Sequence, residues 1–132
     1  MPDNKYMNAR PHYDLTFDKR PHYLYVSIKA EAIDRHMALD YFAEIAHRCA
    51  GIRCKRILLD RDIPVALPNG DLRQTLKEYV EMSKGVKIAF VHRHQAIDKA
   101  WKSAIDHLKK QGADFGYFHD SKMAEKWLLR NH

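Results

Sequence analysis

The amino-acid sequence predicts an α/β fold, a single mixed β-sheet with about four helices in the order ββαβαβαβα. Apolar and polar residues alternate in two neighbouring segments, 13–18 and 24–30, which is typical of half-buried strands. Two short continuous apolar runs, 57–59 and 88–91, have the pattern of parallel strands that are covered on both faces. Apolar residues at helical spacing occupy the segments that separate and follow these strands.

The two alternating segments are predicted to pair as an N-terminal antiparallel hairpin. Leu15 and Phe17 share one face of the first strand, and Val26 and Ile28 share one face of the second. The Lys-Arg-Pro sequence at 19–21 breaks the alternation, and so we expect the chain to reverse there.

Three helices are predicted to follow the second, third and fourth strands. Asp34 can cap the first helix, which is expected to end near Gly51. The second helix follows a Pro-Asn-Gly turn at 68–70, and the third begins near Ile97 and stops at Gly112. Each would cross from one parallel strand to the next.

A fifth strand around 115–118 is predicted to lead directly into a short last helix. Asp120 and Ser121 suit the start of that helix, since their side chains can accept hydrogen bonds from its first N–H groups. Ala124, Trp127 and Leu128 fall on one face, which predicts that this face packs on the sheet.

Composition indicates a single domain, with residues 1–12 as a flexible tail and 13–132 as the folded unit. No apolar run approaches the roughly 20 residues of a membrane-spanning helix, and the first residues lack a secretory signal pattern. We therefore expect a cytoplasmic protein. Cys49 and Cys54 are expected to be reduced thiols in that compartment rather than a disulfide.

The order of the elements and two short motifs resemble the STAS-like family, also called anti-sigma-factor-antagonist-like, particularly its stand-alone bacterial branch. The motifs are Asp-Arg-Asp at 60–62, after the third strand, and Phe-His-Asp at 118–120 followed by Ala124, Trp127 and Leu128. The likeness covers about residues 13–131. It implies a domain that binds a partner protein or a small ligand, with no phosphorylated serine at 60–64, where the sequence has no hydroxyl residue.

Polar side chains gather at the predicted carboxyl ends of the parallel strands, where open α/β sheets bind ligands. Arg61 could hold an anion or an acidic partner, or could pair with one of the adjacent aspartates. The candidate ligand- or partner-binding residues are Asp60, Arg61, Asp62, His92, Arg93, His94 and His119.

An alternative function is a metal-assisted hydrolase that uses His92, His94 and Asp60, because imidazole and carboxylate groups are zinc ligands. Alternate residues of an extended segment point to opposite sides, which disfavours joint coordination by the two histidines. The sequence has no glycine-rich phosphate loop and no serine elbow, and so no cofactor is expected.

The sequence therefore favours a non-catalytic binding or regulatory domain that engages a partner protein or a small ligand, apolar or anionic, at the strand-end loops. A net charge of +6 leaves weak nucleic-acid binding as a further alternative. Asp98 and Asp106 interrupt the lysines of the third helix, which is more typical of a solvated helix face. A homodimer could also form, through the exposed edge of the hairpin or through a helix face.

Overall fold

The computed structural model describes residues 13–130, and the predicted tail at 1–12 lies outside this part of the chain. One five-stranded sheet has the strand order β1-β2-β3-β4-β5. β1 pairs antiparallel with β2, and every later pair is parallel, which confirms the predicted mixed sheet. The strands are β1 (Asp14–Lys19), β2 (Leu24–Lys29), β3 (Arg56–Asp62), β4 (Lys87–His92) and β5 (Phe115–Phe118).

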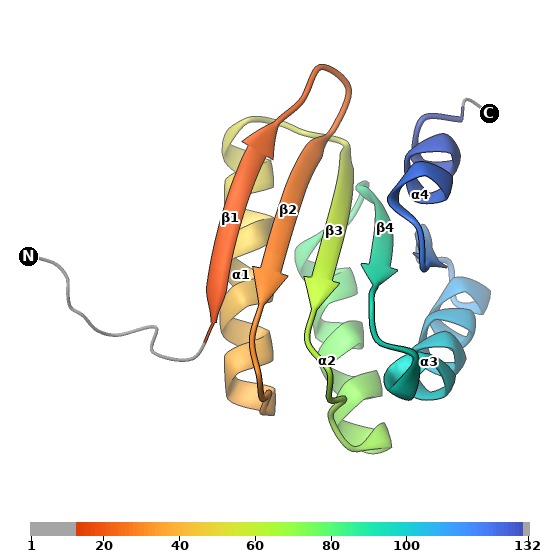
Figure 1. The fold of residues 1–132 in the computed structure, drawn as a ribbon. Coiled ribbons are helices and arrows are strands. Elements are labelled where there is room, and N and C mark those ends of the chain that lie inside the picture. The colour runs from red at the N-terminus through yellow and green to blue at the C-terminus, as the bar shows by residue number, and fades with distance from the viewer. Residues whose placement is uncertain (1–12, 131–132) are drawn as a thin grey trace, which may run out of the picture.

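Three helices cover one face of the sheet and a fourth lies on the other face (Figure 1). A short 3-10 turn, η1, which the sequence pattern did not predict, precedes α3. Among the described residues no helix is long and apolar enough to cross a membrane. The helices are α1 (Arg35–Gly51), α2 (Asn69–Met82), η1 (Gln95–Ile97), α3 (Asp98–Lys110) and α4 (Ser121–Leu128).

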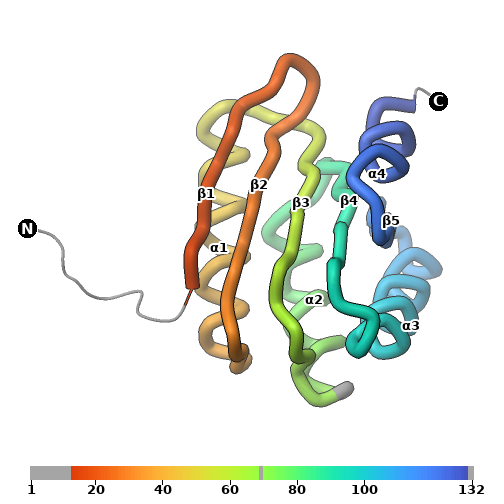
Figure 2. The backbone as a smooth tube through the Cα atoms, viewed as in Figure 1, coloured from red at the N-terminus to blue at the C-terminus, as the bar shows by residue number. Residues whose placement is uncertain are grey.

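The hairpin register places its apolar residues against the helices. Leu15 lies opposite Ile28, and Phe17 lies opposite Val26, as the alternation predicts. α1 then begins as expected, because the Asp34 carboxylate accepts a hydrogen bond of 2.8 Å from the N–H of Met37. The tube in Figure 2 shows α1 running along the back of β1 and β2.

The main core lies between the sheet and α1, α2 and α3. Alternate residues of the central strands, such as Ile57 and Leu59 of β3, are fully buried there against Phe42, Tyr79 and Trp101. Each such aliphatic side chain contributes about 1.5–3 kcal/mol on burial.

The expectation that the two cysteines are reduced is contradicted, because Cys49 and Cys54 form a disulfide with a Cα–Cα distance of 5.1 Å. A tight turn after α1 brings them together. Arg53 adopts a left-handed conformation with φ of 55°, and the N–H of Cys54 donates back to the carbonyl of Cys49. Sequence spacing alone did not reveal this reversal of the chain.

α4 covers the second face of the central strands. Ala124 and Leu128 are fully buried against Leu58 and Ala89, which confirms the predicted inner face of this helix. Gly116 of β5 makes the approach possible, since a Cβ atom there would lie 3.1 Å from the Trp127 ring and 2.7 Å from the Phe118 ring. Among residues 13–130, no helix lies over the rest of this face, at β1 and β2 (Figure 1).

Candidate functional site

The residues at 60–62 lie inside β3 and not in a loop after it, which corrects the sequence-based placement. Asp60, Arg61 and Asp62 pair in register with Ser27 to Lys29 of β2. The backbone ladder with β2 therefore extends the strand through three charged residues. Because side chains alternate along a strand, Arg61 points to the helix-covered face, whereas Asp60 points to the opposite face.

Arg61 is a buried cation whose neighbours are aromatic and hydroxyl groups. Only 2% of the residue is exposed. Its Nε and Nη2 groups donate to the hydroxyl oxygen of Tyr41 at 3.3 and 3.0 Å. The guanidinium carbon lies 4.3 Å from the centre of the Trp101 ring, a cation–π contact.

No carboxylate in residues 13–130 forms an ion pair with Arg61. The predicted alternative, a pair with Asp60 or Asp62, is wrong because Arg93 and His94 bind those carboxylates. Removing an ion from water costs several kcal/mol unless an opposite charge compensates it. Arg61 is therefore a buried positive charge that the described part of the chain leaves without a counter-ion.

His92, the last residue of β4, is also buried and lies beside this cation. Its Nδ1 atom lies 3.2 Å from Nη1 of Arg61 and accepts from it, which places the ring proton on Nε2. The ring packs between Trp101 at 4.3 Å and Tyr117 at 4.9 Å, and Nε2 has no hydrogen-bond partner. Burial, and then the charge of Arg61, hold the pKa of His92 well below its ordinary value of 6.5.

Asp98, at the start of α3, binds two side chains at the outer edge of this cluster. The hydroxyl of Tyr117 donates to one carboxylate oxygen, and Nε2 of His119 lies 3.3 Å from the other. The pKa of Tyr117 is raised by burial and by this hydrogen bond. Sequence patterning placed Asp98 on a solvated face, and only the fold shows that it holds two side chains from the end of β5.

A small cavity of about 10 Å³, enough for one water molecule, adjoins Arg61 between the sheet and the helices. Its three polar lining residues are Tyr41, Arg61 and Thr75. The hydroxyl of Thr75 is buried and has no hydrogen-bond partner. The remaining lining residues are apolar: Ile33, Ala38, Phe42, Leu67, Leu72 and Trp101.

On the opposite face of the sheet, the carboxylate of Asp60 accepts hydrogen bonds from two neighbouring side chains. Arg93 donates to its two carboxylate oxygens at 3.2 and 2.9 Å, and the hydroxyl of Tyr25 donates at 2.6 Å. Burial, followed by the hydrogen bond to Asp60, raises the pKa of Tyr25 to about 12. The charges of Asp60 and Arg93 therefore compensate each other without a ligand.

The third polar group joins β3 to the chain after β4. Nε2 of His94 lies 2.7 Å from the carboxylate of Asp62. This hydrogen bond lowers the pKa of Asp62. The pair sits at the rim of the sheet and is partly exposed.

The structure thus brings the predicted residues to one end of the sheet but divides them among three groups. Arg61 and His92 share the helix-covered face, with His119 at its rim. Asp60 with Arg93, and Asp62 with His94, have partners of their own.

The three residues of the metal hypothesis consequently do not converge. The ring of His92 packs in the helix-covered core, whereas Asp60 faces away from it and His94 binds Asp62. Within residues 13–130 no set of three or more histidine, cysteine, aspartate or glutamate side chains is placed to hold a metal ion.

Tyr41, Thr75 and Trp101 complete the surroundings of Arg61, and sequence reasoning missed all three as site residues. Trp101 was predicted to be core, which is correct for its burial but leaves out its contact with the cation. Because each residue lies on a different helix, no local spacing could connect them.

No family model and no curated protein matches this chain. Solved structures do resemble it. An anti-sigma factor antagonist from Mycobacterium paratuberculosis aligns with a TM-score of 0.63 and 15% identity, over 94% of this chain and 100% of that one. An uncharacterised DUF3478-family protein with a SpoIIAA-like fold, from Shewanella loihica PV-4, aligns with a TM-score of 0.55 and 18% identity, over 93% and 99% of the two chains.

At these identities the likeness establishes the architecture. It agrees with the ββαβαβαβα order and with the mixed sheet described above. The chain therefore has a SpoIIAA-like fold.

Proposed function

We propose that this protein is a non-catalytic binding domain that holds the anionic group of a small molecule against Arg61. The supporting observation is the buried guanidinium without a carboxylate partner, next to a cavity whose polar lining groups are all hydrogen-bond donors. An oxyanion is the chemical group that such a lining favours.

The donors available to an anion are specific. Arg61 has five N–H bonds, of which three are directed at Tyr41 and His92, so two remain. Tyr41 accepts two hydrogen bonds through its oxygen and keeps its own hydrogen to donate. The unpartnered hydroxyl of Thr75 supplies a further donor. A carboxylate can accept from all three residues.

The rest of the cavity lining is apolar, which suits a ligand whose anionic head is attached to a small hydrocarbon body. Two of the lining residues, Ile33 and Leu67, belong to the segments that lead into α1 and α2. A ligand larger than water must displace these segments. Pro64 and Val65 of the second segment are exposed, but Ile63 and Leu67 on either side of them are buried, so admitting such a ligand requires these two side chains to leave the core.

The histidine beside the cation supports binding more than catalysis. Nδ1 of His92 accepts from Arg61, Nε2 carries the ring proton, and the ring is buried between two aromatic side chains. A general base needs a free nitrogen within reach of the substrate. We therefore assign His92 to positioning the guanidinium.

The test is calorimetric titration of the protein with acetate, butyrate, octanoate and inorganic phosphate. Arg61→Met keeps most of the side-chain length and removes the charge, while Arg48→Met makes the same change on the exposed surface of α1. We expect a carboxylate to bind the wild type and Arg48→Met but not Arg61→Met. Equal binding to both variants, or no binding of any of these anions to the wild type, would refute the proposal.

A protein partner at the same end of the sheet is the second candidate. Val65, two residues before the cavity-lining Leu67, is 43% exposed, and the side chain of Arg93, which follows β4, is 56% exposed. The solved structure from Mycobacterium paratuberculosis is named an antagonist of an anti-sigma factor, a role that requires a protein partner.

Affinity capture from a bacterial lysate tests this candidate, with light scattering to separate a second copy of the chain from a different protein. Val65→Asp is expected to abolish capture. Met123→Asp is the matched control, because Met123 is 56% exposed on α4, away from the cavity. Loss of the partner in both variants, or in neither, would exclude Val65 as a contact.

A further inference from the structure

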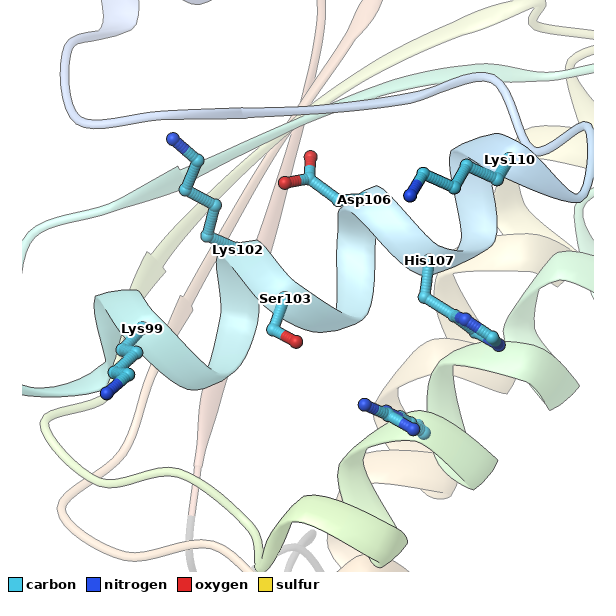
Figure 3. A pocket seen from close by; sticks show the side chains of 7 residues that line it. Lys99, Lys102, Ser103, Asp106, His107 and Lys110 are labelled. Atoms are coloured by element: carbon cyan, nitrogen blue, oxygen red, sulfur yellow. The ribbon is translucent and has the colours of Figure 1, made fainter.

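A basic groove runs along the outer surface of the helix layer, apart from the Arg61 cavity. It is shallow and widely open to solvent, with a volume of about 500 Å³. A second hollow of about 410 Å³ adjoins it and shares Arg73, Lys99 and Ser103. Figure 3 shows the groove residues of α3, with the His107 ring directed towards α2. The groove is lined by Arg73 of α2 and by Lys99, Lys102, Ser103, Asp106, His107 and Lys110 of α3.

The core fixes which side chains of α3 face this groove. Lys99, Ser103, His107 and Lys110 recur at intervals of four, four and three residues and share one helix face. The opposite face, which includes Trp101, is buried against the sheet. Rotation of α3 to hide the lysines would therefore expose the core.

The groove holds four permanent positive charges and one carboxylate. Within residues 13–130, the cations at 73, 99, 102 and 110 form no ion pair, and neither does Asp106. Some basic residues elsewhere in this part of the chain have ion-pair partners, such as Arg93 with Asp60 and Arg35 with Glu78, and others, such as Lys109 and Lys126, form no ion pair. What distinguishes the groove is that four such cations line one depression together with a single carboxylate.

Helix stability does not account for all of these cations. Lysine near the C-terminus of a helix is favoured by the helix dipole, which explains Lys110. Lys99 lies in the first turn, where the same dipole disfavours a positive charge. An external anion would compensate that charge together with Arg73 on the facing helix.

We propose that this groove binds a compact polyanion, a small molecule that carries two or more phosphate groups. Its volume is within the range of roughly 300–1,000 Å³ that small-molecule sites occupy. The hydroxyl of Ser103 adds a neutral donor among the cations. No phenylalanine, tyrosine or tryptophan lines the groove, so it lacks the large stacking platforms of single-stranded nucleic-acid sites.

The experiment is calorimetric titration with inorganic tripolyphosphate, followed by NMR mapping of backbone amides. Saturable binding is expected, with shifts centred on Lys99 and Ser103. The double variant Arg73→Gln/Lys99→Gln should weaken binding at least about tenfold, because two charge-assisted contacts are lost. Lys109→Gln/Lys126→Gln removes the same charge outside the groove lining and should change affinity less than about twofold. Thermal unfolding checks that both variants fold.

Two further probes distinguish the possible sources of the phosphates. If binding is seen only with vesicles that contain phosphatidylinositol bisphosphate, and the groove variant loses it, the groove recognises a lipid headgroup. Binding of single-stranded DNA alone would overturn the proposal. An equal loss of tripolyphosphate affinity in the two double variants would also overturn it, and so would the absence of binding to both tripolyphosphate and the vesicles. Because Arg61→Met leaves this groove intact, a failure of polyphosphate binding can be distinguished from a failure of carboxylate binding at Arg61.

Discussion

Lowering the pH below about 6.5 is expected to destabilise the protein through His92, whose ordinary pKa has that value. The folded-state pKa lies well below it, because the ring is buried beside the Arg61 charge. Between the two pKa values the unfolded chain binds the proton and the folded chain does not. The contribution of His92 to stability is therefore complete above pH 6.5 and declines as the pH falls towards the folded-state pKa.

The size of the effect follows from linkage. One proton taken up on unfolding changes the free energy of unfolding by about 1.4 kcal/mol per pH unit. From pH 6.5 to 5.0 the protein should lose up to about 2 kcal/mol through this residue alone. Asp62, whose pKa is lowered by His94, acts in a separate window, since its stabilisation is lost only below its unfolded value of about 4.

Urea unfolding at pH 7.5, 6.5, 5.5 and 5.0, followed by tryptophan fluorescence, measures the slope. His92→Gln is the matched variant, because the glutamine amide oxygen can still accept from Arg61 but does not titrate in this range. The difference between wild type and variant should appear below pH 6.5. Parallel pH profiles for the two proteins would refute the claim that a buried neutral imidazole supports the guanidinium.

Three other perturbations have expected outcomes. Gly116→Ala should lower the free energy of unfolding by about 1–3 kcal/mol, measured by urea titration, because the new Cβ would lie 2.7 Å from a ring atom on the same strand. In Asp60→Asn, the pKa of Tyr25 should fall from about 12 but stay above its ordinary value, because burial is the larger cause of the shift; ultraviolet titration reports it. Dithiothreitol should lower the free energy of unfolding by about 2 kcal/mol, since the Cys49–Cys54 bridge closes a short loop.

Each of these predictions has a control that can contradict it. Gly51→Ala introduces a Cβ with no atom within 4 Å, so an equal loss of stability there would remove the steric explanation for Gly116. An unchanged tyrosine titration in Asp60→Asn would show that the hydrogen bond has no effect on that pKa. The Cys49→Ser/Cys54→Ser variant should be insensitive to dithiothreitol, and thiol titration of the unfolded wild type should find no free thiols.

The fold could be predicted because its signals are local. Alternation identified the hairpin, and the side chain of Asp34 caps α1 as its residue type suggested. Helical spacing placed Ala124 and Leu128 on the sheet-facing side of α4. Each signal depends on residues within a few positions of one another, where backbone geometry alone determines which side chains share a face.

The candidate site was predicted only in its position at one end of the sheet. Strand alternation separates Asp60 from Arg61, but the pattern could not reveal this while the strand was expected to end before them. The partners of Arg61 come from separate elements, Tyr41 from α1 and Trp101 from α3. Contacts of this kind depend on how helices pack over the sheet, which local spacing does not determine.

The placement of α4 has a consequence for synthesis on the ribosome. The helices α1 to α3 all cover the same face of the sheet, so Leu58, Ala89 and Val91 obtain their apolar cover from a segment that follows all five strands. A nascent chain that has not yet released residues 121–128 can assemble the sheet and its first helix layer but presents this apolar strip to solvent. Chaperones that recognise short hydrophobic strands would meet the protein at that stage, and docking of α4 would end their access.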